Sequence, residues 1–239
     1  MKKKPVGRPR KLKRQNIINI AYNQYWLHGI ENVPLSTIAK VANISRPGIY
    51  VEFGDEDALQ AEVIKKYTYA LEGHVLAQYK DSKDIKTLLF HFNSYIGFPD
   101  EDKKIYIGVR NASIFNTPKA VNGCLYEKAK IVKHLLKKKT VNEINNYEEH
   151  RKNEFKNYIN KMQKNGKIKQ TLKSEDVYEY ISATLLMIQT LKNNGMNKLK
   201  LRELVDKALS AILSPISLIQ TLKLHNNSNS KITSVINIA

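Results

Sequence analysis

Apolar residues recur at spacings of three and four along most of the chain, whereas proline and glycine are confined to a few boundaries. Such spacing places the apolar side chains on one face of an α-helix. No long stretch alternates with the period of two that is typical of a half-buried strand. With 239 residues, the chain is long enough to bury a sizeable core. The pattern therefore predicts an all-α protein.

The expected helices are separated by residues that favour turns or helix ends. Gly29 follows the first helix, Asn43 suits a left-handed turn after the second, and Asn165-Gly166 forms a later turn. Ser45 and Asp55 are typical N-cap residues, and we expect them to begin the third and fourth helices. The expected helices span residues 11–28, 34–42, 45–53, 56–71, 85–96, 103–116, 124–138, 145–164, 175–193 and 198–213.

The chain carries a large excess of positive charge. It has 40 Lys and Arg residues against 22 Asp and Glu residues, a net charge of +18, and eight of these cations lie within residues 1–14. The excess favours a polyanionic partner, either nucleic acid or an anionic membrane surface. Beyond residue 14, a solubilising Lys-rich surface is an equal alternative. Pro5, Gly7 and Pro9 oppose a helix, so we expect residues 1–10 to form a flexible basic arm and residues 221–239 a polar, disordered tail.

Several classes of protein lack support in the sequence. Cys124 is the only cysteine, so no disulfide can form within the chain. No apolar run resembles a signal peptide or approaches the length of a membrane span. The six His have no metal-ligand spacing, and no phosphate-loop, dinucleotide or nucleophile motif occurs. We therefore expect a cytosolic protein that has no membrane partner, catalytic residue, cofactor or metal.

Residues 37–50 have the spacing of a helix-turn-helix. Ala39 is small, as the close packing of the second helix requires, and Asn43 lies at the tight turn. Apolar residues on both sides of the turn would fix the angle between the helices. The expected core of the motif consists of Ile38, Ala39, Asn43, Ile44 and Ile49. The helix that begins at Ser45 would then present its N-terminal residues to DNA.

The N-terminal residues resemble those of the TetR/AcrR family of transcriptional regulators. The resemblance covers about residues 11–65, and its motifs are Gly29-Ile30, Ile38-Ala39, Ala42-Asn43-Ile44-Ser45, Gly48-Ile49-Tyr50, Phe53 and Ala58-Leu59. It implies a three-helix DNA-binding domain over residues 11–56. It also implies a larger helical domain for ligand binding and dimerisation over residues 57–220.

The resemblance also implies roles for individual residues. The recognition helix would approach the major groove, Tyr50 would contact a phosphate, and the basic arm would enter a minor groove. The implied DNA-binding residues are Arg8, Arg10, Ser36, Thr37, Ser45, Arg46, Pro47, Gly48 and Tyr50.

Three residues depart from the family pattern. Val33 replaces the Thr or Ser that often precedes the second helix, Glu56 replaces a frequent Lys, and Asn43 replaces a turn Gly. We expect the acidic run Asp55-Glu56-Asp57 to repel nearby phosphate. Our hypothesis is that the basic arm compensates for the lost contacts.

Dimerisation and ligand binding are implied mainly by the resemblance. The two unusually apolar helices 175–193 and 198–213 would pair across a two-fold axis, although they could instead bury their apolar faces within one chain. The expected interface residues are Val177, Ile181, Leu185, Leu204, Ala208 and Ile212. A small apolar ligand would lie among the central helices, where a filled core is the alternative. Candidate lining residues are Phe92, Tyr95, Phe115, Tyr126 and Met187.

These observations predict a homodimeric, sequence-specific DNA-binding regulator. We expect a repressor that a small ligand releases from a palindromic, double-stranded operator, with coupling through the helix at residues 56–71. One alternative is a DNA-binding regulator without a ligand, whose helical core is simply filled. A more distant alternative is a basic helical enzyme or a protein of the membrane surface.

Overall fold

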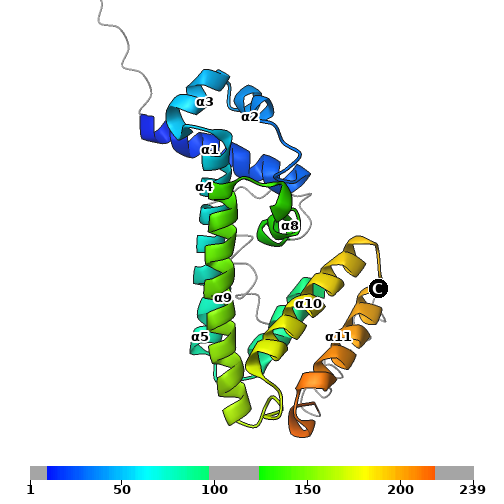
Figure 1. Ribbon diagram of the computed structural model, residues 1–239. Coiled ribbons are helices and arrows are strands. Elements are labelled where there is room, and N and C mark those ends of the chain that lie inside the picture. The colour runs from blue at the N-terminus through cyan, green and yellow to red at the C-terminus, as the bar shows by residue number, and fades with distance from the viewer. Residues whose placement is uncertain (1–9, 97–123, 219–239) are drawn as a thin grey trace, which may run out of the picture. The chain divides into compact units, whose positions relative to one another are not determined.

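The computed structural model describes residues 10–96 and 124–218, and within these ranges it is helical (Figure 1). The described residues contain no strand, only an isolated antiparallel bridge between Ile168 and Leu213. None of the helices in these ranges is both long and apolar enough to cross a bilayer. The all-α class predicted from the apolar spacing is confirmed.

The chain forms two compact units. Of the described residues, 10–74 and 124–150 belong to the first unit, and 75–96 and 151–218 belong to the second. These units differ from the functional domains expected from the sequence, 11–56 and 57–220, because residues far beyond the helix-turn-helix pack into the first unit. The functional division remains a prediction.

The first unit is built around the two long helices α1 (Arg10–His28) and α4 (Glu56–Leu71). The short helices α2 (Leu35–Val41) and α3 (Arg46–Phe53) lie beside them (Figure 1). Helix α8 (Leu125–Ile131) packs against α4 and is followed by the 3₁₀ turn η2 (Lys133–Leu135). The Lys128 ammonium donates a hydrogen bond of 3.0 Å to the Trp26 carbonyl, which joins α8 to α1.

Local side chains set the ends of the N-terminal helices as predicted. Gly29 ends α1 with φ of +91°, and a Cβ at this position would lie 2.9 Å from side-chain atoms of Glu31 and Asn32. The hydroxyl of Ser45 accepts a hydrogen bond from the Gly48 amide at 3.2 Å and begins α3. The carboxylate of Asp55 caps α4 in the same way by accepting from the Ala58 amide at 2.7 Å.

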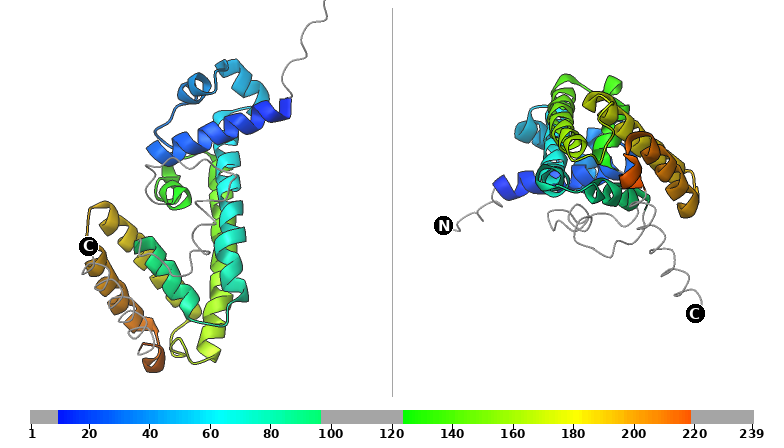
Figure 2. Two further views of the ribbon diagram at one scale, coloured as in Figure 1. Left: turned by 180° about the vertical axis from the view of Figure 1, so that it is seen from behind. Right: turned by 90° about the horizontal axis from the view of Figure 1, so that it is seen from below.

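The second unit consists of α5 (Ala77–Asp81), α6 (Lys86–Ile96), α10 (Ser174–Asn193), α11 (Lys198–Ile212) and the later part of α9 (Lys138–Lys164). Helices α6, α10 and α11 pack against one another (Figure 2). Between the two units the chain passes through the π-helical turn η1 (Glu72–Leu76) and through α9 itself.

Aromatic side chains fill part of the core of the second unit. The ring of Tyr79 lies 4.2 Å from that of Phe155 and 4.9 Å from that of Tyr158, measured between centroids. The hydroxyl of Tyr79 is hydrogen-bonded to Nδ1 of His91. Burial, assisted by the positive charge of Arg151, lowers the pKa of His91 to about 3, so this imidazole is neutral near pH 7.

Several helix boundaries differ from the sequence-based predictions. The helix predicted over residues 124–138 ends at Ile131, and Leu136 has extended backbone before α9 begins. Helix α9 begins at Lys138 rather than at residue 145. The reason is a distant carboxylate: Asp57 accepts hydrogen bonds from the amides of Lys139 and Thr140 and thereby caps α9.

Two smaller differences concern the N-terminal region. Pro34 has ψ of 153° and precedes α2 instead of forming its first turn. Arg10, which the predicted arm includes, is the first residue of α1. The predicted helix over residues 103–116, the tail 221–239 and the rest of the arm lie outside the described residues.

Candidate nucleic-acid interface

Helices α2 and α3 form a helix-turn-helix whose inner face is well packed. The side chains of Ile38 and Ile49 are fully buried, and Ala39 is 4% exposed. Ile44 is half-buried. Asn43 has φ of +51°, the left-handed conformation expected of the turn residue, and no other described residue apart from glycine has a positive φ. The two helices are therefore held at a defined angle by a small apolar core.

The outer face of α3 carries the side chains that the family resemblance assigns to DNA. Arg46, Pro47 and Tyr50 are exposed, and the side chain of Tyr50 is 43% accessible. Ser45 is exposed and Gly48 is half-buried at the N-terminus of the helix. On α2, Ser36 is exposed and Thr37 is half-buried. The structure thus brings these seven residues together on one short motif.

The remaining two candidates come from the arm and are not placed. Arg8 lies outside the described residues, and of Arg10 only the backbone is described.

One exposed residue of the interface escaped the sequence analysis. Val51 is 71% exposed on α3, although a valine within an apolar pattern is expected to be buried. It lies one and four residues after Tyr50 and Pro47, so the three share one helix face. In the sequence, only its spacing of four residues from Pro47 could have indicated that Val51 is exposed.

Arg14 makes contacts within the fold that its place in the basic N-terminal cluster did not predict. It was counted with the basic N-terminal cluster, yet its guanidinium donates hydrogen bonds to the Glu52 carbonyl and to the Glu62 carboxylate. It also lies 4.2 Å from the centroid of the Phe53 ring. Arg14 therefore joins α1 to α3 and α4, and stabilises the motif from within.

Two residues of the acidic run at the start of α4 make hydrogen bonds that were not predicted from the sequence. Asp57 is 7% exposed and accepts from the Lys139 amide at 2.8 Å, the Thr140 amide at 2.9 Å and the Thr140 hydroxyl at 2.7 Å. Asp55 accepts a hydrogen bond from the Lys139 ammonium at 2.7 Å, which lowers the pKa of its carboxyl. Two of the three acids thus bind the N-terminus of α9, and we call this set of contacts the α4–α9 clamp.

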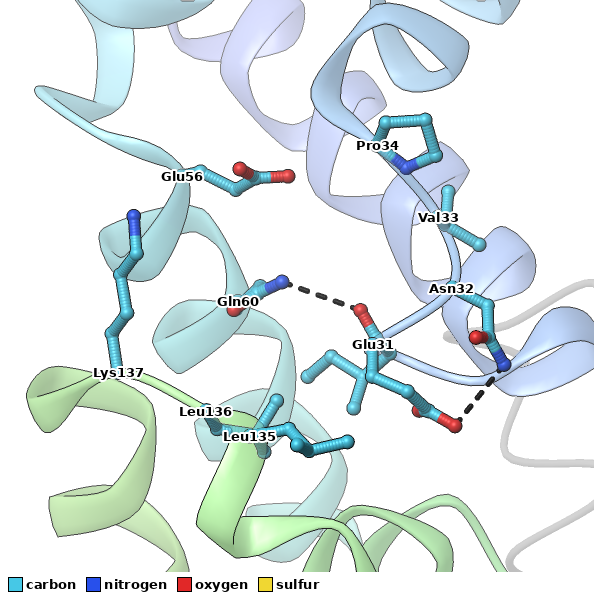
Figure 3. A pocket seen from close by; sticks show the side chains of 10 residues that line it. Glu31, Asn32, Val33, Pro34, Glu56, Gln60, Leu135, Leu136 and Lys137 are labelled. Atoms are coloured by element: carbon cyan, nitrogen blue, oxygen red, sulfur yellow. Dashed lines mark hydrogen bonds between the residues drawn. The ribbon is translucent and has the colours of Figure 1, made fainter.

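A cleft of about 570 Å³ opens beside the clamp in the same unit (Figure 3). It is bounded by the α1–α2 loop, by the first two turns of α4 and by the connection between η2 and α9. Gln60 crosses from α4 to the loop and donates a hydrogen bond of 3.3 Å to the Ile30 carbonyl. The described residues contain no cluster of side chains that could hold a metal ion.

Comparison with known proteins gives matches in structure but not in sequence. No family model matches the chain, and no curated protein sequence matches it. A TetR-family regulator from Agrobacterium tumefaciens superposes with a TM-score of 0.66 at 14% identity, covering 85% of this chain and 99% of the other. The reduced form of NemR from E. coli gives a TM-score of 0.65 at 11% identity, covering 85% and 98%.

This chain has the TetR-family regulator fold.

A third structure with this fold holds a small molecule. It is a transcriptional regulator from Saccharomonospora viridis in complex with choline, with a TM-score of 0.62 at 15% identity and coverage of 86% of this chain and 100% of the other. The matches extend over most of both chains, so the TetR fold includes the helices that follow the helix-turn-helix.

The described ligand candidates are divided between the two units of this TetR fold. Phe92 is buried in the second unit, while Met187 in the same unit is 40% exposed. Tyr126 belongs to the first unit, where it donates to Glu148 and packs edge-on against Tyr147. The side chain of Tyr95 and all of Phe115 lie outside what the structure describes. The ligand assignment is untested.

The expected dimer residues divide into two classes. Val177, Ile181, Leu185 and Ile212 are buried within a single chain, at 8% exposure or less, whereas Leu204 and Ala208 are half-buried. The apolar side chains exposed on α10 are instead Tyr180, Leu186 and Met187, each accessible to about two-fifths (38%, 38% and 40%). Burial within the chain therefore accounts for part of the apolar pattern, as the alternative reading allowed.

Proposed function

We propose that this protein is a sequence-specific DNA-binding transcriptional regulator that reads its operator with α3. The observation that carries the proposal is the exposed set of Arg46, Pro47 and Tyr50 on a helix whose opposite face is locked into the first unit. Arg46 suits the acceptor atoms of guanine, and the exposed methyls of Val51 suit the methyl group of thymine. The net charge of +18 supports attraction to the phosphate backbone.

Dimerisation is part of the proposal, because one helix-turn-helix holds DNA weakly and two on a palindrome hold it well. The exposed apolar residues Tyr180, Leu186 and Met187 of α10 support a contact with a second copy. Sedimentation equilibrium would test it: a Leu186→Glu variant should shift the chain from dimer toward monomer. An unchanged dimer would exclude this face.

We further propose that the protein is a repressor of the bacterial cytosol and that a small ligand regulates it. A neighbour of the same fold that binds choline supports the capacity of the fold to hold small molecules. In the proposed mechanism, DNA and ligand prefer different separations of the two recognition helices, so that each weakens the binding of the other by the same factor.

A binding selection on random duplex DNA at near-physiological salt tests the central proposal. The wild-type chain should enrich a palindrome, and Arg46→Ala should lose that enrichment because it removes the base contact. Lys200→Ala, an exposed residue of α11 with the same charge change, serves as the matched control and should retain it. Failure of the wild-type chain to enrich any sequence would refute sequence-specific binding.

A further inference from the structure

The cleft beside the α4–α9 clamp has the size of a small-molecule site. Its volume of about 570 Å³ lies within the range of roughly 300–1,000 Å³ that is usual for ligand pockets. Three separate segments of the first unit supply its walls, and Figure 3 shows the side chains of Glu56 and Pro34 facing each other across it. A molecule in this cleft would therefore contact the loop before α2 and the start of α4 together.

The walls combine apolar surface with polar groups. Ile30 and Val33 are buried at the loop, and Leu135 is 61% exposed at the opposite side. An apolar side chain this exposed at a cleft suits contact with another molecule. These residues favour an occupant with an apolar body.

A buried tyrosine of α1, Tyr25, lies near the cleft-lining residues Glu56 and Gln60. The side chain of Tyr25 is fully buried. Burial raises the pKa of this phenol, and the charge of Glu56 raises it further.

The charge of the cleft is unusual for so basic a chain. Asp55 and Asp57 are held by the clamp, but Glu56 between them has no hydrogen bond or ion pair with a described residue. Its half-buried carboxylate extends from α4 toward the α1–α2 loop (Figure 3). Glu31 adds a second carboxylate, while Lys137, the single cation of the lining, lies in the field of Asp55.

We propose that this cleft binds a small organic cation, with its ammonium group against Glu56 and its apolar body against Val33 and Leu135. The net charge of +18 repels cations from the chain as a whole, so that binding here requires a specific local site. If the chain is the regulator proposed above, the bound cation bridges the loop before α2 and the start of α4, and changes the affinity for the operator.

Calorimetric titration of the full chain with benzyltrimethylammonium, in the absence of DNA, tests the proposal. N-Benzylacetamide and phenylacetate are neutral and anionic controls of similar size. We expect saturable binding of one probe per chain, with hydrogen-exchange protection at residues 30–34 and 135–137. Glu56→Gln should weaken the binding roughly tenfold, since it removes the partly desolvated charge contact. Glu203→Gln, an exposed position on α11, makes the same charge change and should leave binding unaltered.

Three outcomes would overturn the cation site: equal affinity of the wild type and Glu56→Gln, equal affinity for the neutral amide, or no saturation up to about 10 mM probe. Because the titration contains no DNA, its result is independent of the proposed function. Failure to find an operator would refute the proposed regulator but not the cation site. Failure of the probe to bind would refute the cation site but not the proposed regulator.

Discussion

Asn43 shows how a single residue fixes the geometry of the helix-turn-helix. Its φ of +51° places it in the left-handed region, which asparagine tolerates and β-branched residues do not. We predict that Asn43→Val lowers the free energy of unfolding by about 1–2 kcal/mol, whereas Asn43→Gly changes it by less than about 0.5 kcal/mol. Urea unfolding monitored by circular dichroism measures both. Equal losses in the two variants would show that the left-handed conformation of residue 43 does not determine the change in the free energy of unfolding.

Cys124 provides a prediction about pH. Burial, and then the charge of Glu127, raise the pKa of the thiol to about 11, in spite of the hydrogen bond of 3.2 Å from the Tyr67 hydroxyl. At pH 8 the thiolate is therefore roughly a hundredfold rarer than for a thiol at its ordinary pKa of 9.0. Reaction with a disulfide reagent should be about tenfold slower than in the unfolded chain, because the greater nucleophilicity of the more basic thiolate offsets part of its rarity, and should still accelerate above pH 9. A rate that levels off between pH 9 and 10 would contradict the raised pKa.

At the scale of elements, the α4–α9 clamp joins residues that are 82 and 83 positions apart in the sequence. Asp57→Ala removes the acceptor of two helix-end amides and one acceptor of the Thr140 hydroxyl. We predict a loss of about 2–3 kcal/mol in the free energy of unfolding, because the amides of Lys139 and Thr140 would lose their acceptor, whereas the Thr140 hydroxyl keeps the carbonyl of residue 57. Denaturant titration at pH 7 measures the loss.

Asp81→Ala is the matched control for this prediction, because Asp81 is exposed at the end of α5. It should change the free energy of unfolding by less than about 0.5 kcal/mol. If Asp57→Ala cost no more than this control, the clamp would be dispensable and the position of α9 would depend on packing alone.

The same elements show what the sequence could and could not predict. Helix α4 was predicted over 56–71, as found, because its cap Asp55 and its apolar stripe are local. The start of α9 was predicted seven residues too late, since its cap Asp57 lies in another helix. Arg14 was likewise counted with the basic N-terminal cluster that favours a polyanionic partner, because its partner Glu62 is 48 positions away. Local chemistry is readable from a sequence, whereas long-range polar pairs require the folded chain.

The sequence predicted the residues of the candidate interface but not the cleft. Its α2 and α3 residues were found from the motif and from the resemblance, and the structure brings them together. The cleft was not predicted, because its walls come from residues 30–34, 56–60 and 135–137, which have no common sequence pattern. Glu56 was read as a departure from the family pattern that repels phosphate, and its position facing the cleft gives it a different role in our proposal.

At the scale of the whole molecule, charge should contribute strongly to DNA affinity. Deletion of residues 2–10 removes five cations, Lys2, Lys3, Lys4, Arg8 and Arg10. We predict that affinity for the operator falls at least about tenfold, and that its dependence on salt becomes shallower, because fewer counterions are released on binding. Fluorescence anisotropy at several salt concentrations measures both quantities. Unchanged affinity would exclude a role of the arm in binding.

The most direct test of a sequence-reading α3 is the ratio of operator affinity to scrambled-DNA affinity, measured at one salt concentration for the wild type, Arg46→Ala and Lys200→Ala. Loss of a base contact lowers this ratio, whereas loss of a phosphate contact lowers both affinities together. We predict that Arg46→Ala lowers the ratio by roughly tenfold or more, and that Lys200→Ala leaves it unchanged. A ratio near one for the wild type, or equal ratios for all three proteins, would contradict the account.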